Sequence, residues 1–215
     1  MVVRYDAKLE HGLTIIQAKT PPDDGKTRLI KGAMHCVADH GISGSSVRRI
    51  AEYAGVTPGL VRHHFGNKDT LLAECYRDLN TLALQRMAQS FADDGQTLSA
   101  QLRAALHAFF PEDLRDVRKM RVLVAFWGAV LTTDAFADVQ KETNSAFYDF
   151  LAGLLRRHLG DRADLAMLAD AVMALIDGLW LECCMNPDHM TPEAAIERAH
   201  HFCCLALESL QSVDR

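Results

Sequence analysis

The apolar residues of this chain recur at intervals of three and four positions from Gly25 almost to its end, and this helical period constrains the fold more than any other feature. The spacing first appears at these positions: Leu29, Ile30, Ala33, Met34 and Val37. Such spacing places apolar side chains on one face of a helix, which must be buried against another element. No segment alternates convincingly at period two, as a half-buried strand would. The sequence therefore predicts an all-α protein of about nine helices.

Residues that end or cap helices divide this pattern into segments. Gly41 is placed to end the first helix, and Ser45 or Ser46 can cap the second. A third helix is expected to open at Thr57-Pro58, with proline at its first helical position. The longer helices are expected at about residues 67–92, 97–110, 113–131, 134–158, 162–185 and 192–211.

Charge is distributed unevenly along the chain. The formal net charge is −5, whereas residues 25–68 contain seven Lys or Arg and two Asp or Glu and so have a local charge of +5. A basic segment in an otherwise acidic protein indicates one surface suited to an anionic partner such as nucleic acid. A solvated helical face would show the same charge, so charge alone leaves both interpretations open.

Apolar runs, the first residues and the cysteines indicate in which cellular compartment the protein is expected. No apolar run approaches the roughly 18 residues needed to span a bilayer, so no membrane partner is expected. The first residues are charged where a signal peptide would be apolar. The six cysteines show no CxxC spacing and do not resemble a disulfide framework. We expect a cytoplasmic protein, and no motif indicates a cofactor.

Residues 46–65, with the sequence SVRRIAEYAGVTPGLVRHHF, contain the most informative motif. Two short helices are joined by a turn that starts at a glycine. Ile50 of the first helix and Val61 and Phe65 of the second are spaced to face inward and pack together. This is the plan of a helix-turn-helix, whose second helix enters the major groove of DNA.

If Val61 and Phe65 are buried, the opposite face of the second helix must point outward. Small residues there allow close approach to base edges, and Arg62 can hydrogen-bond guanine or a phosphate. Residues at the helix ends, and the arginines of the preceding helix, are suited to phosphate contacts. The predicted DNA-binding residues are Ser46, Arg48, Thr57, Pro58, Gly59, Arg62, His63, His64 and Lys68.

Residues 27–74 resemble the DNA-binding domain of TetR-family regulators. The shared features are the IAxxAGV turn, the Thr-Pro-Gly that opens a helix, the Phe-Gly-x-Lys exit and the Leu-Leu that begins the fourth helix. Tyrosines are common in the family at the positions of Arg62 and His64. The resemblance therefore implies the fold and the groove-binding helix, but individual base and phosphate contacts do not transfer from it.

The resemblance also implies a domain organisation. Residues 1–24 would be an N-terminal arm, residues 25–68 the helix-turn-helix DNA-binding domain, and residues 69–215 a helical effector-binding and dimerisation domain. Two copies related by a two-fold axis suit a palindromic operator. The last two helices are the dimer candidates, and the resemblance favours an interface for a stripe on 192–211 whose alternative is the chain's own core. The stripe consists of Ile196, Ala199, His200, Cys203, Leu207 and Leu210.

Residues 120–185 resemble the effector domain of BetI-like TetR members, which respond to choline, in the segments VLVAFWGAVLTTDAFADVQKETNSAFYDFL and ALIDGLWLE. A quaternary ammonium is held by aromatic faces and a nearby carboxylate. Asp177 and Trp180 are three apart and share a helix face. Core packing is the alternative explanation, because aromatic residues on amphipathic helices more often belong to a core. The predicted ligand-binding residues are Phe126, Trp127, Phe147, Tyr148, Asp177 and Trp180.

Other functions have weaker support. The sequence contains no phosphate loop, nucleophile elbow or HExxH pattern, so we expect no enzyme and no catalytic residues. His63-His64 lacks the i, i+4 partner of a metal site. The leading hypothesis is a homodimeric repressor that a small molecule, such as choline, releases from its operator. Two alternatives stay open, an unrelated hydrophobic effector and a thiol-based redox signal at Cys183-Cys184 or Cys203-Cys204. A protein-interaction module without DNA binding is a third.

Overall fold

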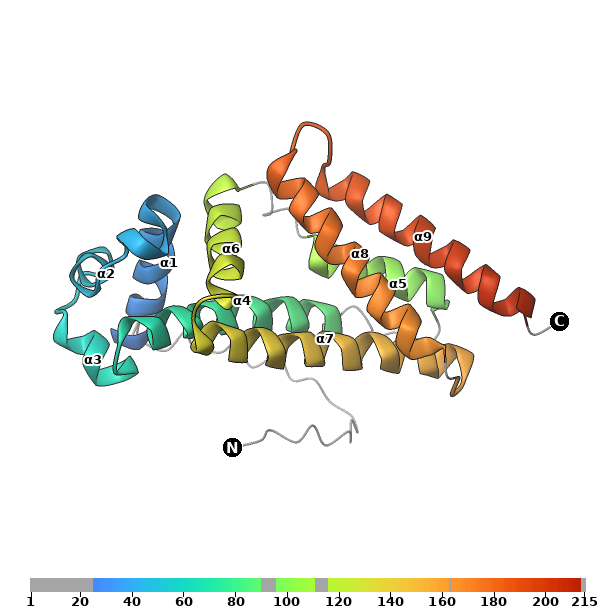
Figure 1. Ribbon diagram of the computed structural model, residues 1–215, viewed down its shortest axis with the longest axis horizontal. Helices are drawn as coiled ribbons and strands as arrows, with labels where there is room; N and C mark the ends of the chain where they lie inside the picture. The colour runs from blue at the N-terminus through green and yellow to red at the C-terminus, as the bar shows by residue number, and fades with distance from the viewer. Residues whose placement is uncertain (1–24, 90–95, 111–115, 163, 214–215) are drawn as a thin grey trace, which may run out of the picture.

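The computed structural model describes residues 25–89, 96–110, 116–162 and 164–213, and all regular secondary structure in these ranges is helical (Figure 1). Within them nine helices follow in the order α1 (Gly25–Gly44), α2 (Val47–Ala54), α3 (Gly59–Phe65), α4 (Lys68–Gln89), α5 (Leu98–Phe109), α6 (Val117–Val130), α7 (Asp134–Leu159), α8 (Leu165–Met185) and α9 (Pro192–Val213). The all-α prediction is confirmed. The predicted arm and the predicted helix end at residues 90–95 lie outside the described residues.

The predicted helix boundaries agree with the observed ones to within a few residues, and the start of α6 differs most. The sequence predicts this helix from residue 113, whereas it begins at Val117. Asp116 has extended backbone angles (φ −76°, ψ 102°), and its carboxylate accepts a hydrogen bond from the Arg118 backbone N–H at 2.9 Å. This N-cap sets the start of α6.

Backbone and capping signals separate the first helices where the sequence predicts. Gly41 has φ 66° and ψ 176° inside α1, a conformation that favours glycine and interrupts the helix. The Ser46 side chain caps α2 by accepting a hydrogen bond from the Arg49 N–H at 3.2 Å. Gly55 ends α2 in the left-handed conformation, with φ 62°.

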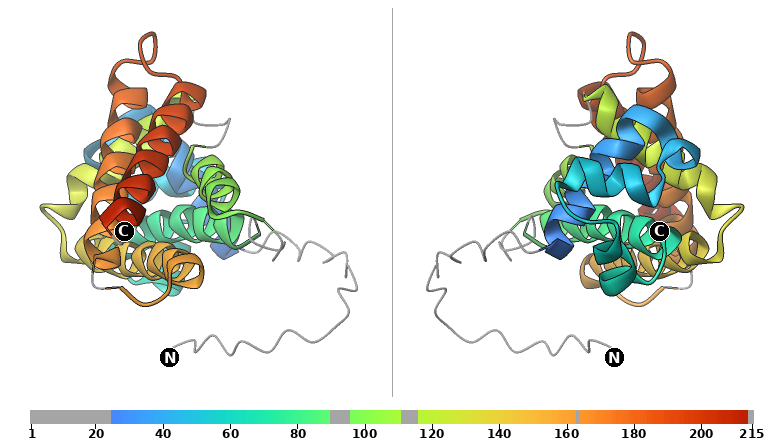
Figure 2. Two further views of the ribbon diagram at one scale, coloured as in Figure 1. Left: turned by 90° about the vertical axis from the view of Figure 1, so that its right-hand side faces the viewer. Right: turned by 90° about the vertical axis from the view of Figure 1, so that its left-hand side faces the viewer.

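The helices form an elongated molecule with α1–α3 at one end and α8 and α9 toward the other (Figure 1). Helices α4 and α7 run side by side along the molecule and contact each other. Helix α6 packs against α1 on one side and α7 on the other. The two end views in Figure 2 show α8 and α9 side by side at one end and α1–α3 at the other. In Figure 1, α6 lies between the first three helices and α8 and α9, whereas α4 contacts α1 and α3 directly.

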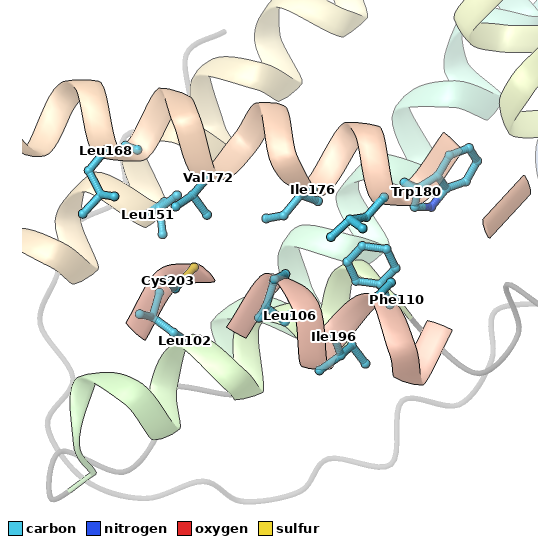
Figure 3. Packing of buried hydrophobic residues seen from close by; sticks show 14 of the residues in the cluster. Leu102, Leu106, Phe110, Leu151, Leu168, Val172, Ile176, Trp180, Ile196 and Cys203 are labelled. Carbon is cyan, nitrogen blue, oxygen red and sulfur yellow. The ribbon is translucent and has the colours of Figure 1, made fainter. Parts of the chain in front are cut away.

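Two large hydrophobic cores stabilise this arrangement. In the C-terminal core, one face of α8 packs against α5 and α9 (Figure 3). The N-terminal core joins α1–α4 and extends through Val122 and Phe126 of α6 to Phe136 and Val139 of α7. This core crosses the predicted domain boundary at residue 68, so the first three helices and α6 share one packed unit.

No single helix in the described ranges is long and apolar enough to cross a lipid bilayer. Helices α6 and α7 pass that test only as a pair, and they are bent by 106° relative to each other.

Candidate DNA-binding and effector sites

Helices α1–α3 pack into a tight unit that positions α3. Ile50 of α2 and Val61 and Phe65 of α3 are buried, as the motif predicts. A Cβ atom on Gly32 of α1 would lie 2.7 Å from the backbone nitrogen of Ala54. Helix α1 therefore approaches the end of α2 more closely than any side chain at this position would allow. The direction of α3 follows from this packing.

The outward face of α3 consists of small and polar residues. Pro58, Gly59, Arg62 and His63 are all exposed, in agreement with the prediction from the buried face. The helix begins at Gly59, one residue later than predicted, although Pro58 already has helical angles (φ −57°, ψ −28°). An exposed short helix with small residues at its start can enter a major groove and approach base edges.

The residues around the start of α2 are exposed but partly engaged. The Ser46 hydroxyl accepts the capping hydrogen bond and can still donate one to a phosphate. Arg48 pairs with Glu52 at 3.1 Å, and 86% of its side chain is exposed. Such a pair contributes only about 0.3–0.5 kcal/mol, so a phosphate can replace the glutamate. The Arg49 guanidinium donates to the Gly44 carbonyl at the end of α1.

The remaining predicted phosphate contacts lie at the ends of α3 and the start of α4. Thr57 and His64 are exposed, and the His63 and His64 rings lie 4.8 Å apart. Lys68 is half-buried, and its Nζ lies 3.4 Å from the Ile42 carbonyl oxygen. Lys68 therefore ties α4 to the end of α1, and a phosphate would compete with this bond. Its contact with DNA stays a prediction.

A cavity of 460 Å³ is lined by residues of α1 and α4–α8, together with Asp116. Its volume lies in the usual range for small-molecule sites, about 300–1,000 Å³. Its apolar lining includes Leu79, Leu82, Phe109, Val122, Leu123, Phe147, Met173 and Ile176. One wall is polar and consists of Tyr76 and Asn80 of α4 with Gln140, Thr143 and Asn144 of α7.

One part of the cavity combines two indole rings with a carboxylate. The ring centroids of Trp127 of α6 and Trp180 of α8 lie 4.8 Å apart, with 43° between the planes. Asp177 lies one turn before Trp180 and also lines the cavity. Its side chain is exposed, yet the surrounding protein desolvates the carboxyl group and raises its pKa. A cation placed here would meet both the aromatic faces and the carboxylate charge.

Tyr76 of α4 belongs to the same part of the cavity. Its hydroxyl donates to the Gln140 side chain of α7. Burial raises the pKa of Tyr76, and the charge of Asp177 acts in the same direction, whereas hydrogen bonds with the Asn80 and Trp127 side chains oppose the shift. These interactions show that Tyr76 lies close to Asp177 and Trp127. Tyr76, Trp127 and Trp180 thus line the same cavity as the Asp177 carboxylate.

Four of the six predicted ligand residues line the cavity, namely Trp127, Phe147, Asp177 and Trp180. Phe126 does not, because it is fully buried with its ring 5.5 Å from that of Tyr76 and 5.4 Å from that of Phe136. It directly precedes Trp127, and neighbours on a helix point about 100° apart. Tyr148 does not line the described cavity either, and packs half-buried against the C-terminal core. Neither residue therefore belongs to the lining of this cavity, and the role of the other four in effector binding stays a prediction.

The polar wall was absent from the predicted site. Tyr76 and Asn80 are four apart and therefore share one face of α4. Asn80 donates to the Thr143 hydroxyl at 3.1 Å, and Gln140 donates to Asn144 at 2.8 Å. Uncharged polar residues spaced i, i+4 on one helix face are a signal for such a wall. The signal becomes specific only when α4 is known to pack against α7.

The apolar stripe of α9 faces the chain's own core. Ile196, Ala199, Cys203 and Leu207 are buried, and Figure 3 shows Ile196 and Cys203 within the core formed with α5 and α8. His200 lies at the edge of this core, with Nε2 2.9 Å from the Ser99 hydroxyl. The alternative interpretation of this stripe as an intramolecular one is therefore correct. An interface through α9 must use its other side.

The thiols give little support to redox sensing. Burial raises the pKa of Cys203 to about 11 and that of Cys184 to about 12. Such thiols stay protonated at neutral pH, whereas the thiolate is the reactive form. In the described part of the chain no three or more His, Cys, Asp or Glu side chains form a group that could hold a metal ion.

Comparisons with known proteins agree with both halves of the molecule. Residues 29–75 match the family described as bacterial regulatory proteins, tetR family, and residues 99–207 match the one described as BetI-type transcriptional repressor, C-terminal. The HTH-type transcriptional regulator BetI of Stenotrophomonas maltophilia is 30% identical over 156 residues, which are 73% of this chain and 79% of that protein.

Solved structures show the same architecture. A putative transcriptional regulator from Pseudomonas aeruginosa is 31% identical, with a TM-score of 0.77 over 86% of this chain and 90% of that one. A putative regulator from Saccharomonospora viridis in complex with choline is 20% identical, with a TM-score of 0.71 over 84% of this chain and 96% of that one. At that identity the second likeness concerns the fold alone. The chain belongs to the TetR family of DNA-binding transcriptional regulators, which are not enzymes, and to its BetI-type group.

Proposed function

We propose that this regulator is a repressor that binds a palindromic operator as a homodimer and leaves it when a quaternary ammonium compound occupies the cavity. The observation that supports the effector class most directly is the carboxylate of Asp177 beside the rings of Trp127 and Trp180. The complex of the Saccharomonospora viridis regulator with choline is consistent with this class. Because the proposed partner is operator DNA, we expect the protein to act in the cytoplasm.

The proposed effector is bound by three forces. The apolar lining takes up methyl groups, the rings attract the cation, and the carboxylate compensates its charge. A desolvated cation–π contact contributes about 2 kcal/mol. The raised pKa of Asp177 indicates a carboxyl group that lacks full compensation, and a bound cation would provide it.

The proposed dimer surface is the exposed side of α8 and α9. Side chains there are large and apolar, with 70% of Met167, 64% of Met185, 42% of Phe202 and 52% of Leu205 exposed in the single chain. Gly178 lies on the exposed side of α8, where an added Cβ would meet no atom of the chain within 4 Å. A second copy packed on this surface would bury it and relate two α3 helices by a two-fold axis.

The release step requires that the effector prefers one conformation. A ligand shifts the equilibrium only by the difference in its affinity for the operator-bound and released conformations. The cavity is lined by α1 and α4 as well as α6, so the effector can contact the DNA-binding helices directly. The preferred conformation would hold the two α3 helices at a spacing that no longer matches the half-sites.

Operator binding is tested by shift assays with DNA from upstream of the regulator's own gene. We expect the logarithm of the association constant to fall linearly with the logarithm of the salt concentration, because phosphate contacts release counterions. A scrambled duplex of the same length and composition is the control. Equal affinity for both duplexes would contradict an operator function.

Effector binding is tested by calorimetric titration with choline, glycine betaine and larger quaternary ammonium compounds. We expect the Asp177→Asn variant to lose most of the affinity and Tyr148→Phe, outside the cavity, to keep it. The same compounds should release the operator. If an uncharged apolar compound binds the unmodified protein and no cation does, the hydrophobic-effector alternative replaces the cationic one.

The dimer surface is tested by Gly178→Arg with Gly153→Arg as its matched control. Both glycines lie on exposed helix positions without neighbours within 4 Å. We expect Gly178→Arg to sediment as a monomer and Gly153→Arg as a dimer. If both variants form dimers of normal stability, the interface does not include this part of α8.

A further inference from the structure

The cavity has a second, basic region formed by α1 and the first turn of α6. Lys31 and His35 line it from α1, and Arg118 and Lys119 line it from α6. We call these four residues the basic rim. Arg86 of α4 also lines the cavity. The rim belongs to the same cavity as the carboxylate of Asp177 but to different helices.

Cationic side chains outnumber acidic ones among the described residues that line the cavity. Among the described lining residues four are cationic, Lys31, Arg86, Arg118 and Lys119, and two are acidic, Asp116 and Asp177. The Asp116 carboxylate caps α6 by accepting a hydrogen bond from a backbone N–H. Asp177 lies on α8, beside the tryptophans. Arg118 of the rim is itself paired with Asp39, which does not line the cavity, so an anionic group at the rim would compete with that carboxylate for the guanidinium.

Helix geometry gives the separation of the two regions. Arg118 and Trp127 both line the cavity from α6 and are nine residues apart in the sequence. At a rise of 1.5 Å per residue, this corresponds to about 13.5 Å between their backbone positions along the helix axis. A ligand with its cation between Trp127 and Asp177 must therefore be extended to reach the rim.

Arg118 also connects the cavity to the DNA-binding helices. Its guanidinium lies 2.9 Å from the Asp39 carboxylate at the end of α1. Asp39 also accepts a hydrogen bond from the Tyr53 hydroxyl of α2 at 3.0 Å, and His40 Nε2 lies 3.1 Å from that hydroxyl. The path from the cavity to α2, the first helix of the helix-turn-helix, thus consists of Arg118, Asp39 and Tyr53.

We propose that the effector is an extended zwitterion, whose carboxylate or phosphate end binds Arg118 and Lys119 while its quaternary ammonium lies beside Asp177, and that its anionic end competes with Asp39 for Arg118. The inference rests on the proposed function, because it assumes a cation at Asp177. It adds a second subsite of opposite charge and a direct connection from that subsite to α2.

The competition is physically feasible because the existing pair is partly solvated. About half of the Arg118 side chain, 52%, and 31% of the Asp39 side chain are exposed. Partly exposed ion pairs are weak, whereas a bidentate contact of arginine with a carboxylate or phosphate inside a cavity is stronger. Loss of the pair with Arg118 would leave Asp39 bound to Tyr53 alone and loosen α6 from α1 and α2.

The anion subsite is tested with ω-trimethylammonio carboxylates of increasing chain length and the matching amides, measured by calorimetric titration. The two series share the cation and the chain and differ only in the anionic charge. We expect each carboxylate that is long enough to reach the rim to bind about tenfold tighter than its amide, as for a charge-assisted hydrogen bond. Equal affinities at every length would overturn the subsite.

Variants locate the subsite. Arg118→Gln and Lys119→Gln should each reduce the advantage of carboxylate over amide without changing the affinity for choline. Lys141→Gln is the matched control, since Lys141 is an exposed lysine of α7 that does not line this cavity. An advantage that survives both rim substitutions would overturn the assignment. If choline binds the unmodified protein and the carboxylates gain nothing, the proposed function stands and only this inference fails.

The connection to α2 is tested with Asp39→Asn, which removes the competitor but leaves the rim intact. This variant should bind the long carboxylates at least as tightly as the unmodified protein. Its operator affinity, followed by fluorescence anisotropy, should respond less to them, because the Arg118 pair is already weakened. An unchanged response to carboxylates in Asp39→Asn would overturn the coupling.

Discussion

The DNA-reading surface and the effector cavity are built in different ways. The outward residues of α3 come from one short stretch, Pro58 to His64, and rest on packing among α1–α3. The cavity draws its walls from six helices, including α1 and α6, which also belong to the core beneath α3. Substitutions of the outward residues of α3 should therefore change DNA binding alone. Substitutions in the cavity or the shared core should affect both functions.

The shared core is tested most strongly by Phe126→Ala. Phe126 of α6 is fully buried between Tyr76 of α4 and Phe136 of α7, in the core that also holds α1–α3. Removal of a buried phenyl ring costs about 3–5 kcal/mol in free energy of unfolding. Chemical denaturation should show this loss, and operator and effector binding should weaken together.

Leu131→Ala is the control for this prediction, because Leu131 is a large residue just after α6 that is 88% exposed. It should leave stability nearly unchanged. If Phe126→Ala weakened effector binding but left the α1–α3 unit at full stability, the two parts would not share one core.

The close approach of α1 to the end of α2 can be tested by adding one methyl group at Gly32. A Cβ on Gly32 would lie 2.7 Å from the backbone nitrogen and 2.8 Å from the Cβ of Ala54. Gly32→Ala should therefore cost up to about 3 kcal/mol through overpacking and lower operator affinity. The same change at Gly128, where nothing lies within 4 Å, should stabilise α6 by about 0.5–1 kcal/mol. Thermal unfolding measures the melting temperatures of both variants. Shifts of the same sign in the two melting temperatures would contradict the prediction.

The predicted DNA contacts allow a smaller change without loss of the fold. Arg62 is exposed on α3, so Arg62→Ala should weaken operator binding by about 1–2 kcal/mol and relax specificity at one base pair. Lys68→Ala should weaken binding to all sequences, and it also removes the bond to the Ile42 carbonyl. Titrations with operator and random duplexes separate the two. Wild-type affinity of both variants for both duplexes would refute the assigned contacts.

Sequence patterns predict what depends on neighbours along the chain. The capping by Ser46, the glycine turn after α2 and the buried pair of Val61 and Phe65 are each set within a few residues, and the structure contains all three. The pairing of Asp177 with Trp180 on one face of α8 is local in the same sense. For such features, helical spacing and capping preferences already determine the geometry.

Features that depend on which helices pack together were not predictable in the same way. The spacing of Ile196, Ala199 and Cys203 fits a core and a dimer interface equally well, and only the packing of α9 against α5 and α8 decides between them. Phe126 and Trp127 are adjacent and both aromatic, yet Phe126 is buried in the core and Trp127 lines the cavity. The bond between Arg118 and Asp39 joins residues 79 positions apart.

The smallest expected effect concerns the proton of Asp177. Effector binding in the cavity should depend on this proton, whereas DNA binding by α3 should not. Because desolvation raises the pKa of this carboxyl group, the folded protein binds the proton more tightly than the unfolded chain does. The group therefore stabilises the fold fully only below its unfolded pKa, and this contribution is lost as the pH rises through the folded pKa.

Asp177→Asn resembles the protonated form and should raise the melting temperature of the ligand-free protein slightly at neutral pH, with the gain disappearing in acid. For the unmodified protein, affinity for a quaternary ammonium should fall as the pH drops through the raised pKa, because only the carboxylate attracts the cation. Operator affinity of the ligand-free protein should show no difference between the two proteins over the same range. Calorimetric titrations and thermal melts across mildly acidic pH measure both, and identical pH profiles for the variant and the unmodified protein would mean that Asp177 is not the cation's partner.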